Sequence, residues 1–117
     1  MISNGPSRSF TREAVETWLH NLSNCDWEGK IPEKILKQAR QFYRNGNLST
    51  LDLKSKQAIV TQKIMRNESY SVIEWNEDKP VVRTSLDDEG KGMVIAVAGL
   101  YEIEELIAEI QRLPTDP

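Results

Sequence analysis

Apolar residues recur at helical spacing in two segments of the first half of the chain. The first stripe consists of Ala14, Val15, Trp18, Leu19 and Leu22, and the second of Ile35, Leu36, Ala39, Phe42 and Tyr43. Such spacing places all members of a stripe on one face of a helix. Thr11 can cap the first helix, and Pro32 suits the first turn of the second. We therefore expect helices at residues 11–23 and 32–44, with a stop at Gly46.

Beyond Gly46 the helical periodicity gives way to short runs of β-branched and apolar residues. Strands are predicted at residues 48–53, 58–64, 70–75 and 80–85. Turns are predicted at residues 76–79 and 87–90, where Asn, Asp and Gly gather. The run Met93–Ala98 (MVIAVA) fits either a buried strand or the start of a helix, and its β-branched residues favour a strand.

The segment from Tyr101 to Leu113 is amphipathic. Its apolar face carries Leu100, Ile103, Leu106, Ile107, Ile110 and Leu113, and its polar face carries Glu102, Glu105, Glu109 and Arg112. This spacing predicts a C-terminal helix that ends before Pro114.

The predicted order is two N-terminal helices, a four- to five-stranded antiparallel meander and one C-terminal amphipathic helix. Runs of strands that are separate from runs of helices are typical of the α+β class, with helices on one face of the sheet. Residues 1–9 are polar and include Gly5 and Pro6. We therefore expect a flexible arm at residues 1–9 and a single α+β domain at residues 10–114.

A chain of 117 residues, of which 38% are hydrophobic, can form one domain with its own core, and this composition excludes a disordered protein. The single cysteine, Cys25, excludes an internal disulfide and a zinc site built from several cysteines. No apolar run approaches the length that crosses a bilayer. These features predict a cytoplasmic protein without a membrane partner.

Charge is distributed unevenly around a net value of −3. Residues 30–66 hold nine basic and two acidic side chains, whereas residues 67–117 hold four basic and twelve acidic ones. The basic side chains of the first region are Lys30, Lys34, Lys37, Arg40, Arg44, Lys54, Lys56, Lys63 and Arg66. Such a region suits nucleic-acid phosphates, although a pI near 5.2 is low for a nucleic-acid-binding domain. The acidic region could equally neutralise it within the fold.

No catalytic constellation emerges from the sequence. His20 is the single histidine, and Cys25 stands next to Asp26 instead of the positive neighbours that a reactive thiolate needs. The acids at residues 87–89 are consecutive, whereas a calcium loop alternates its ligands over about twelve residues. We therefore predict no catalytic residues, no metal site, no cofactor and no enzymatic activity.

The segment Ile35–Trp75 resembles the region just before the SWIM zinc finger of bacterial Swi/Snf-type helicase-like ATPases. In that family a helix with an aromatic residue precedes a turn glycine, a leucine-bearing strand, an apolar strand and a Tyr-x-Val strand. The matching residues in this sequence are Tyr43, Gly46, Leu51, Ile59, Val60, Tyr70 and Val72. The resemblance covers about a third of the chain, and its motifs are short.

The resemblance would place a Cys-x-Cys pair and a Cys-x-His pair between Val82 and Leu100, where GKGMVIAVAGL is similar to the surroundings of the last pair. Val82, Thr84, Met93 and Ile95 occupy the approximate ligand positions, and such side chains cannot hold zinc. The resemblance therefore implies a finger-like module in which an apolar core replaces the metal. The ATPase motors are absent from this sequence, so ATP hydrolysis is not implied.

Two functions remain open. The first is a non-enzymatic accessory domain, as the N-terminal module of a helicase-like protein, that contacts nucleic acid through the basic 30–66 surface. The alternative is a protein–protein interaction module or homodimer that uses the C-terminal helix. In that alternative, the apolar face of the helix is larger than one hydrophobic core requires. The remainder of this face contacts another domain or a second copy. Its residues would be Leu100, Ile103, Ile107 and Ile110.

Overall fold

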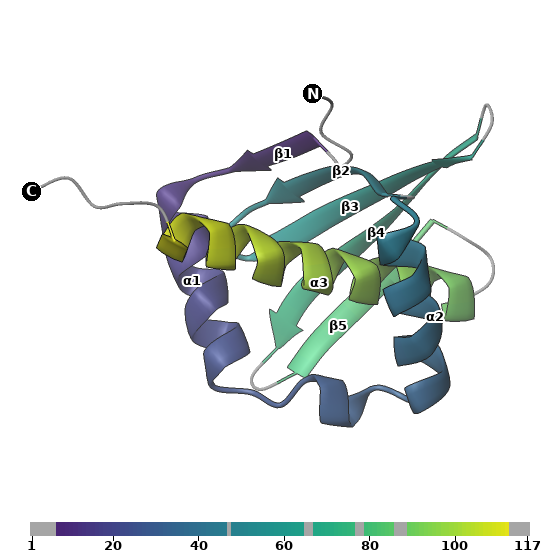
Figure 1. Cartoon of the computed structure of the whole chain (residues 1–117), viewed down its shortest axis with the longest axis horizontal. Coiled ribbons are helices and arrows are strands. Elements are labelled where there is room, and N and C mark those ends of the chain that lie inside the picture. Colours follow the sequence, from purple (N-terminus) through teal and green to yellow (C-terminus); the bar gives the residue numbers. More distant parts are fainter. Residues whose placement is uncertain (1–6, 47, 65–66, 77–78, 86–88, 113–117) are drawn as a thin grey trace, which may run out of the picture.

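The computed structural model describes residues 7–46, 48–64, 67–76, 79–85 and 89–112. The elements are β1 (Ser7–Phe10), α1 (Arg12–Ser23), the 3₁₀ turn η1 (Glu28–Lys30), α2 (Glu33–Arg44), β2 (Leu48–Leu53), β3 (Gln57–Ile64), β4 (Asn67–Asn76), β5 (Lys79–Thr84) and α3 (Glu89–Arg112). The five strands form one sheet in the order β1-β2-β3-β4-β5. Figure 1 shows α3 lying across the sheet, with α1 and α2 near its two ends.

The sheet is mixed, so the prediction of a purely antiparallel meander was wrong, although the class is α+β. Strands β2 to β5 are antiparallel, but β1 runs parallel to β2, with Ser7 opposite Thr50 and Phe10 opposite Leu53. Residues 7–9, which we expected in a flexible arm, therefore belong to a strand. This strand has no apolar alternation because most of it is exposed, and its position depends on backbone pairing and on Arg8.

Helix α3 begins at Glu89 instead of Tyr101, so the prediction of a strand at Met93–Ala98 was also wrong. Ile95 to Ala98 are buried in the core, and a helix that is apolar on most sides lacks the amphipathic period that identifies a surface helix. Gly99 allows α3 to approach the sheet closely, since a Cβ there would lie 2.4 Å from a methyl carbon of Val60. The predicted turn at 87–90 is partly replaced by the helix start, and its first two residues lie outside the described part of the chain.

The predicted helices at the N-terminal side are confirmed, together with the cap at Thr11 and the stop at Gly46, whereas Pro32 lies just before the first residue of α2 and not in its first turn. The hydroxyl of Thr11 accepts a hydrogen bond from the amide of Ala14 at 3.1 Å, which satisfies one free N–H group of α1. Gly46 has a φ of 70°, the left-handed conformation that ends many helices. Trp18 is fully buried, and its indole N–H donates to the carbonyl of Lys54 at 2.7 Å. This bond fastens α1 to the end of β2.

The two faces of the sheet differ because side chains alternate along each strand. Leu51, Val60 and Ile73 point to the helix side and are buried in the core. Ile59 and Val72 occupy the alternate positions and are only half-buried. Within the described residues, no helix covers this second face (Figure 1).

Candidate functional site

The basic residues of α2 form an exposed strip on the side of the helix that faces away from the core. Leu36 and Ala39 are buried, whereas Lys34, Lys37 and Arg44 are exposed. These three cations lie at i, i+3 and i+10, a spacing that places them along one side of a helix. We call Lys34, Lys37 and Arg44 the α2 basic strip. Lys30 is also exposed and lies just before α2, in η1.

Arg40 is held by acidic neighbours within the fold. Its guanidinium lies 3.5 Å from a carboxylate oxygen of Glu28 and 4.0 Å from one of Glu33. The hydroxyl of Tyr101 donates to Glu28 at 3.0 Å, and burial is the main cause that raises the pKa of this tyrosine. Arg40 is therefore partly neutralised, but by acids that lie before residue 67, so this pairing is not the one expected from the acidic region 67–117.

A shallow groove of about 520 Å³ separates the C-terminal half of α2 from α3. Its lining consists of Arg40, Tyr43, Arg44, Tyr101, Glu104, Glu105 and Ala108. Burial raises the pKa of Glu104, and the indole N–H of Trp27, 3.4 Å away, opposes this shift. The cations line the α2 side of the groove and the carboxylates line the α3 side, so the groove presents no field of a single sign.

The remaining basic residues lie away from α2. Lys54 and Lys56 are exposed at the connection between β2 and β3, and Lys54 lies 3.9 Å from Asp52. The six residues of β2, about 20 Å in length, separate this connection from the end of α2. Figure 1 places α2 and this connection toward opposite ends of the sheet. Lys63 lies in β3 with its side chain outside the described part, and Arg66 lies outside it altogether.

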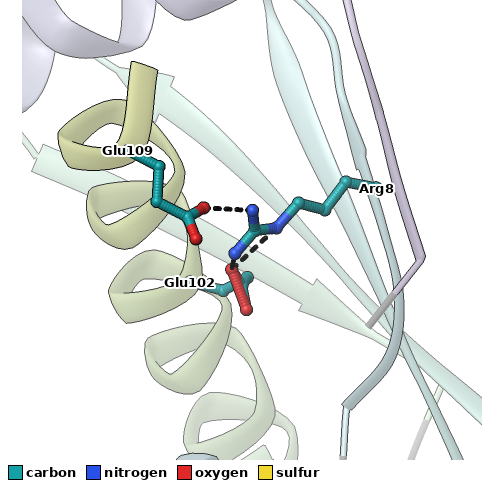
Figure 2. A network of polar contacts seen from close by, with 3 residues as sticks. All are labelled: Arg8, Glu102 and Glu109. Carbon is teal, nitrogen blue, oxygen red and sulfur yellow. Dashed lines mark hydrogen bonds and ion pairs between the residues drawn. The ribbon is translucent and has the colours of Figure 1, made fainter. Parts of the chain in front are cut away.

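An ion-pair network that sequence reasoning missed joins β1 to α3 (Figure 2). The guanidinium of Arg8 donates from Nε to Glu102 at 3.0 Å, and it also pairs with Glu109, which lies two helical turns further along α3. Glu102 was predicted on the polar face of the helix, but only 2% of its surface is exposed. The placement of Glu102 was therefore wrong, because Arg8 of β1 and Tyr43 of α2 lie against that part of the helix.

Burial governs the electrostatics around Glu102. Desolvation raises the pKa of its carboxyl group above the ordinary value, and the hydrogen bond from Arg8 opposes this shift. The neighbouring Tyr43 has its pKa raised to about 12, first by burial and then by the charges of Glu102 and Glu105. These groups connect three elements of the fold, and their geometry indicates a structural role.

The four residues predicted as an alternative interface do not form a free apolar face. Leu100, Ile103 and Ile107 are buried in the core, and Ile110 packs against it. Helix α3 uses these side chains to contact the sheet and the other helices. They are therefore unavailable to a partner while the domain is folded.

Other chemistry-bearing residues are dispersed. His20 is exposed on α1 and lies beside the side chain of Asn24, and Cys25 is a half-buried thiol that is not part of a disulfide. Within the described ranges, no group of three or more His, Cys, Asp or Glu residues is placed to hold a metal ion. The approximate ligand positions of the resemblance are divided between β5, with Val82 and Thr84, and α3. None of the helices described is both long and apolar enough to cross a membrane.

The chain was compared with family models, with curated proteins and with solved structures, and none of these three comparisons found a match.

Proposed function

We propose that this protein is a non-enzymatic accessory domain that contacts nucleic-acid phosphates through the α2 basic strip. The observation that carries the proposal is the position of Lys34 and Lys37 in the N-terminal half of α2, exposed and on one side. A helix N-terminus carries partial positive charge, so the cation of Lys34 in the first turn of α2 weakens the helix slightly. Its presence is not explained by local stability, whereas a polyanion would use it directly.

The mechanism is electrostatic. Cations that contact phosphates release condensed counterions, so affinity falls as the salt concentration rises. For about three phosphate contacts on a duplex, a fourfold increase in salt weakens binding roughly 40-fold. Arg40 and Lys54 contribute less because Glu28 and Asp52 already neutralise part of their charge. The resemblance to the region before a SWIM finger agrees with an accessory role beside a nucleic-acid motor.

The test is fluorescence anisotropy of labelled single- and double-stranded DNA at about 50 mM and about 200 mM salt, a range over which phosphate contacts lose affinity. We expect measurable binding at low salt, and loss of that binding when Lys34, Lys37 and Arg44 are changed together to Glu. A matched control changes Lys54 and Lys56 to Glu at the other end of the sheet, and it should retain most of the affinity. Absence of binding at low salt, or equal loss in both variants, would contradict the proposal.

A further inference from the structure

The face of the sheet opposite the helices has an apolar centre. Ile59 on β3 and Val72 on β4 lie next to each other in the register, and both are half-buried without belonging to the core. Val81 on β5 is also half-buried, and Tyr70 has 48% of its surface exposed. A solvated face of an antiparallel sheet normally carries polar residues at such positions. This departure indicates that the face contacts something apolar.

Charged residues of opposite sign flank this centre in the same row across the sheet. The register places Asp52 of β2 opposite Ile59, Ile59 opposite Val72, and Val72 opposite Arg83 of β5. The row therefore reads acidic, apolar, apolar, basic across four adjacent strands. We call these four residues the central row of the outer face.

The central row is complementary to itself. Consider a two-fold axis that runs parallel to the strands, above the outer face and between β3 and β4. Rotation about this axis places the central row of a second copy against that of the first, in the reverse order. Under this rotation Asp52 faces Arg83 of the second copy, and Ile59 faces Val72. Twofold interfaces of this kind use one patch on both subunits. The neighbouring row is compatible with the same rotation. Gln57 and Glu74 are opposite each other in the register, so the rotation brings Gln57 against Glu74 of the second copy, and an amide can donate to a carboxylate.

The available area fits a weak dimer. With the axis between β3 and β4, the strands that overlap are β2 to β5. Strands spaced by about 4.8 Å and about six residues of about 3.3 Å each then give an overlap of roughly 19 by 20 Å. Two such faces together bury roughly 800 Å², below the standard range and in the size class of weak, transient contacts. Two sheets that pack face to face with aligned strands also match a common architecture, in which the strands cross at about −30°.

We propose that the outer face of the sheet is the interface of a homodimer in which Asp52 of each copy pairs with Arg83 of the other. Arg83 already contacts Glu74 at 2.8 Å, but 75% of its side chain is exposed. A guanidinium has five N–H donors, so it can retain Glu74 and bind a second carboxylate. The α2 basic strip lies in the helix layer on the other side of the sheet. The dimer and the proposed nucleic-acid contact are therefore independent.

The test is the mass of the full chain by light scattering and sedimentation velocity, over concentrations from about 1 to about 500 µM, a range suited to a weak interface. We expect the mass to rise from 13.4 kDa toward twice this value as the concentration increases. Val72→Lys places a charge at the apolar centre and should keep the protein monomeric. Lys34→Glu, in the helix layer, is the matched control and should leave the self-association unchanged.

Two further variants test the orientation of the dimer. Asp52→Arg makes two arginines face each other, and Arg83→Asp makes two aspartates face each other, so each variant by itself should lose association at least tenfold. Mixing the two variants restores opposite charges at both contacts, and the mixture should form a heterodimer. Asp52, Val72 and Arg83 all lie outside the core. Circular dichroism and the melting temperature should therefore verify that each variant remains folded.

A monomeric mass at every concentration would overturn the proposal and would leave the face to a different partner. A dimer that is indifferent to Asp52→Arg and Arg83→Asp, or a mixture that fails to associate, would overturn it as well. Neither result bears on binding of DNA by α2, which the anisotropy experiment tests separately.

Discussion

Helices α2 and α3 differ in the burial and the pairing of their charged side chains. On α3, Glu102 is buried and lies against Arg8, which comes from a distant strand. On α2, Lys34 and Lys37 are exposed, and Lys34 stands in the first turn, where the helix dipole disfavours cations. A buried charge must be compensated for the chain to fold, whereas an exposed cation can be changed with little effect on folding. The ion pair of Glu102 is therefore part of the packed fold, whereas Lys34 and Lys37 are not required for folding, which agrees with the binding role proposed for them.

The largest loss of stability should come from removing an apolar contact of α3. Ile103 on α3 is fully buried, and Ile103→Ala should lower the free energy of unfolding by about 3 kcal/mol because it leaves a cavity. Gln41→Ala, on the exposed side of α2, is the control and should change stability by less than about 0.5 kcal/mol. Urea denaturation measures both values. Equal losses would show that the buried side chain of Ile103 contributes no more to stability than an exposed side chain.

The Arg8 network should give the next largest effect. Arg8→Ala leaves the Glu102 carboxylate buried without its partner, and we expect a loss of about 2 kcal/mol near pH 7. The pKa of Glu102 is higher in the folded protein than in the unfolded chain. The stability that protonation of Glu102 provides is therefore complete below the unfolded pKa, and it is lost as the pH rises through the folded pKa. Removing Arg8 raises that pKa further. The deficit of the variant should therefore shrink as the pH falls toward about 4, near the unfolded pKa of a glutamate.

The matched control for this prediction is the double variant Arg8→Ala with Glu102→Gln. An amide carries no charge, so the double variant should recover part of the stability at pH 7 and lose most of the pH dependence. Thermal denaturation between pH 4 and pH 7.5 measures both. A deficit of the single variant that is constant over this range would show that Arg8 acts through packing and not through its charge.

The smallest effect, and one of opposite sign, is expected on α2. Lys34→Glu replaces a cation in the first turn by an anion, which should stabilise the folded protein by a few tenths of a kcal/mol. The same change should weaken binding to DNA. Melting curves at low salt, compared with Lys34→Gln, measure the first effect, and anisotropy measures the second. If Lys34→Glu lowered both the stability and the affinity for DNA, the distinction between the two helices would be lost.

Local signals predicted most of the elements. Thr11, Pro32 and Gly46 carry capping and turn chemistry that acts within a few residues, so both N-terminal helices ended close to the predicted positions. Strands β3 to β5 followed from β-branched and apolar runs, and β2 followed from its spaced leucines. The apolar run at Met93–Ala98 could not be assigned by periodicity, because a helix buried on most sides and a buried strand look alike in one dimension.

The parts of the molecule that depend on distant contacts were not predictable. Strand β1 has no pattern of its own, and its parallel pairing with β2 follows from a crossover through α1 and α2. The burial of Glu102 depends on Arg8, which no spacing rule connects to it. For the candidate site, the basic residues of α2 were identifiable from sequence, but their separation from Lys54 and Lys56 required the path of β2.

The contact between Arg8 and Glu102 also constrains the order of events during synthesis. The two residues are 94 positions apart, so Arg8 leaves the ribosome roughly 5 to 20 seconds before its partner at ordinary rates of translation. The contact of β1 with α3 must therefore wait until most of the last helix has been made, whereas its pairing with β2 requires only the first half of the chain. Contacts of such long range slow folding, because the chain between them must be ordered first. The ion pair of Arg8 with Glu102 should therefore be among the last contacts to form.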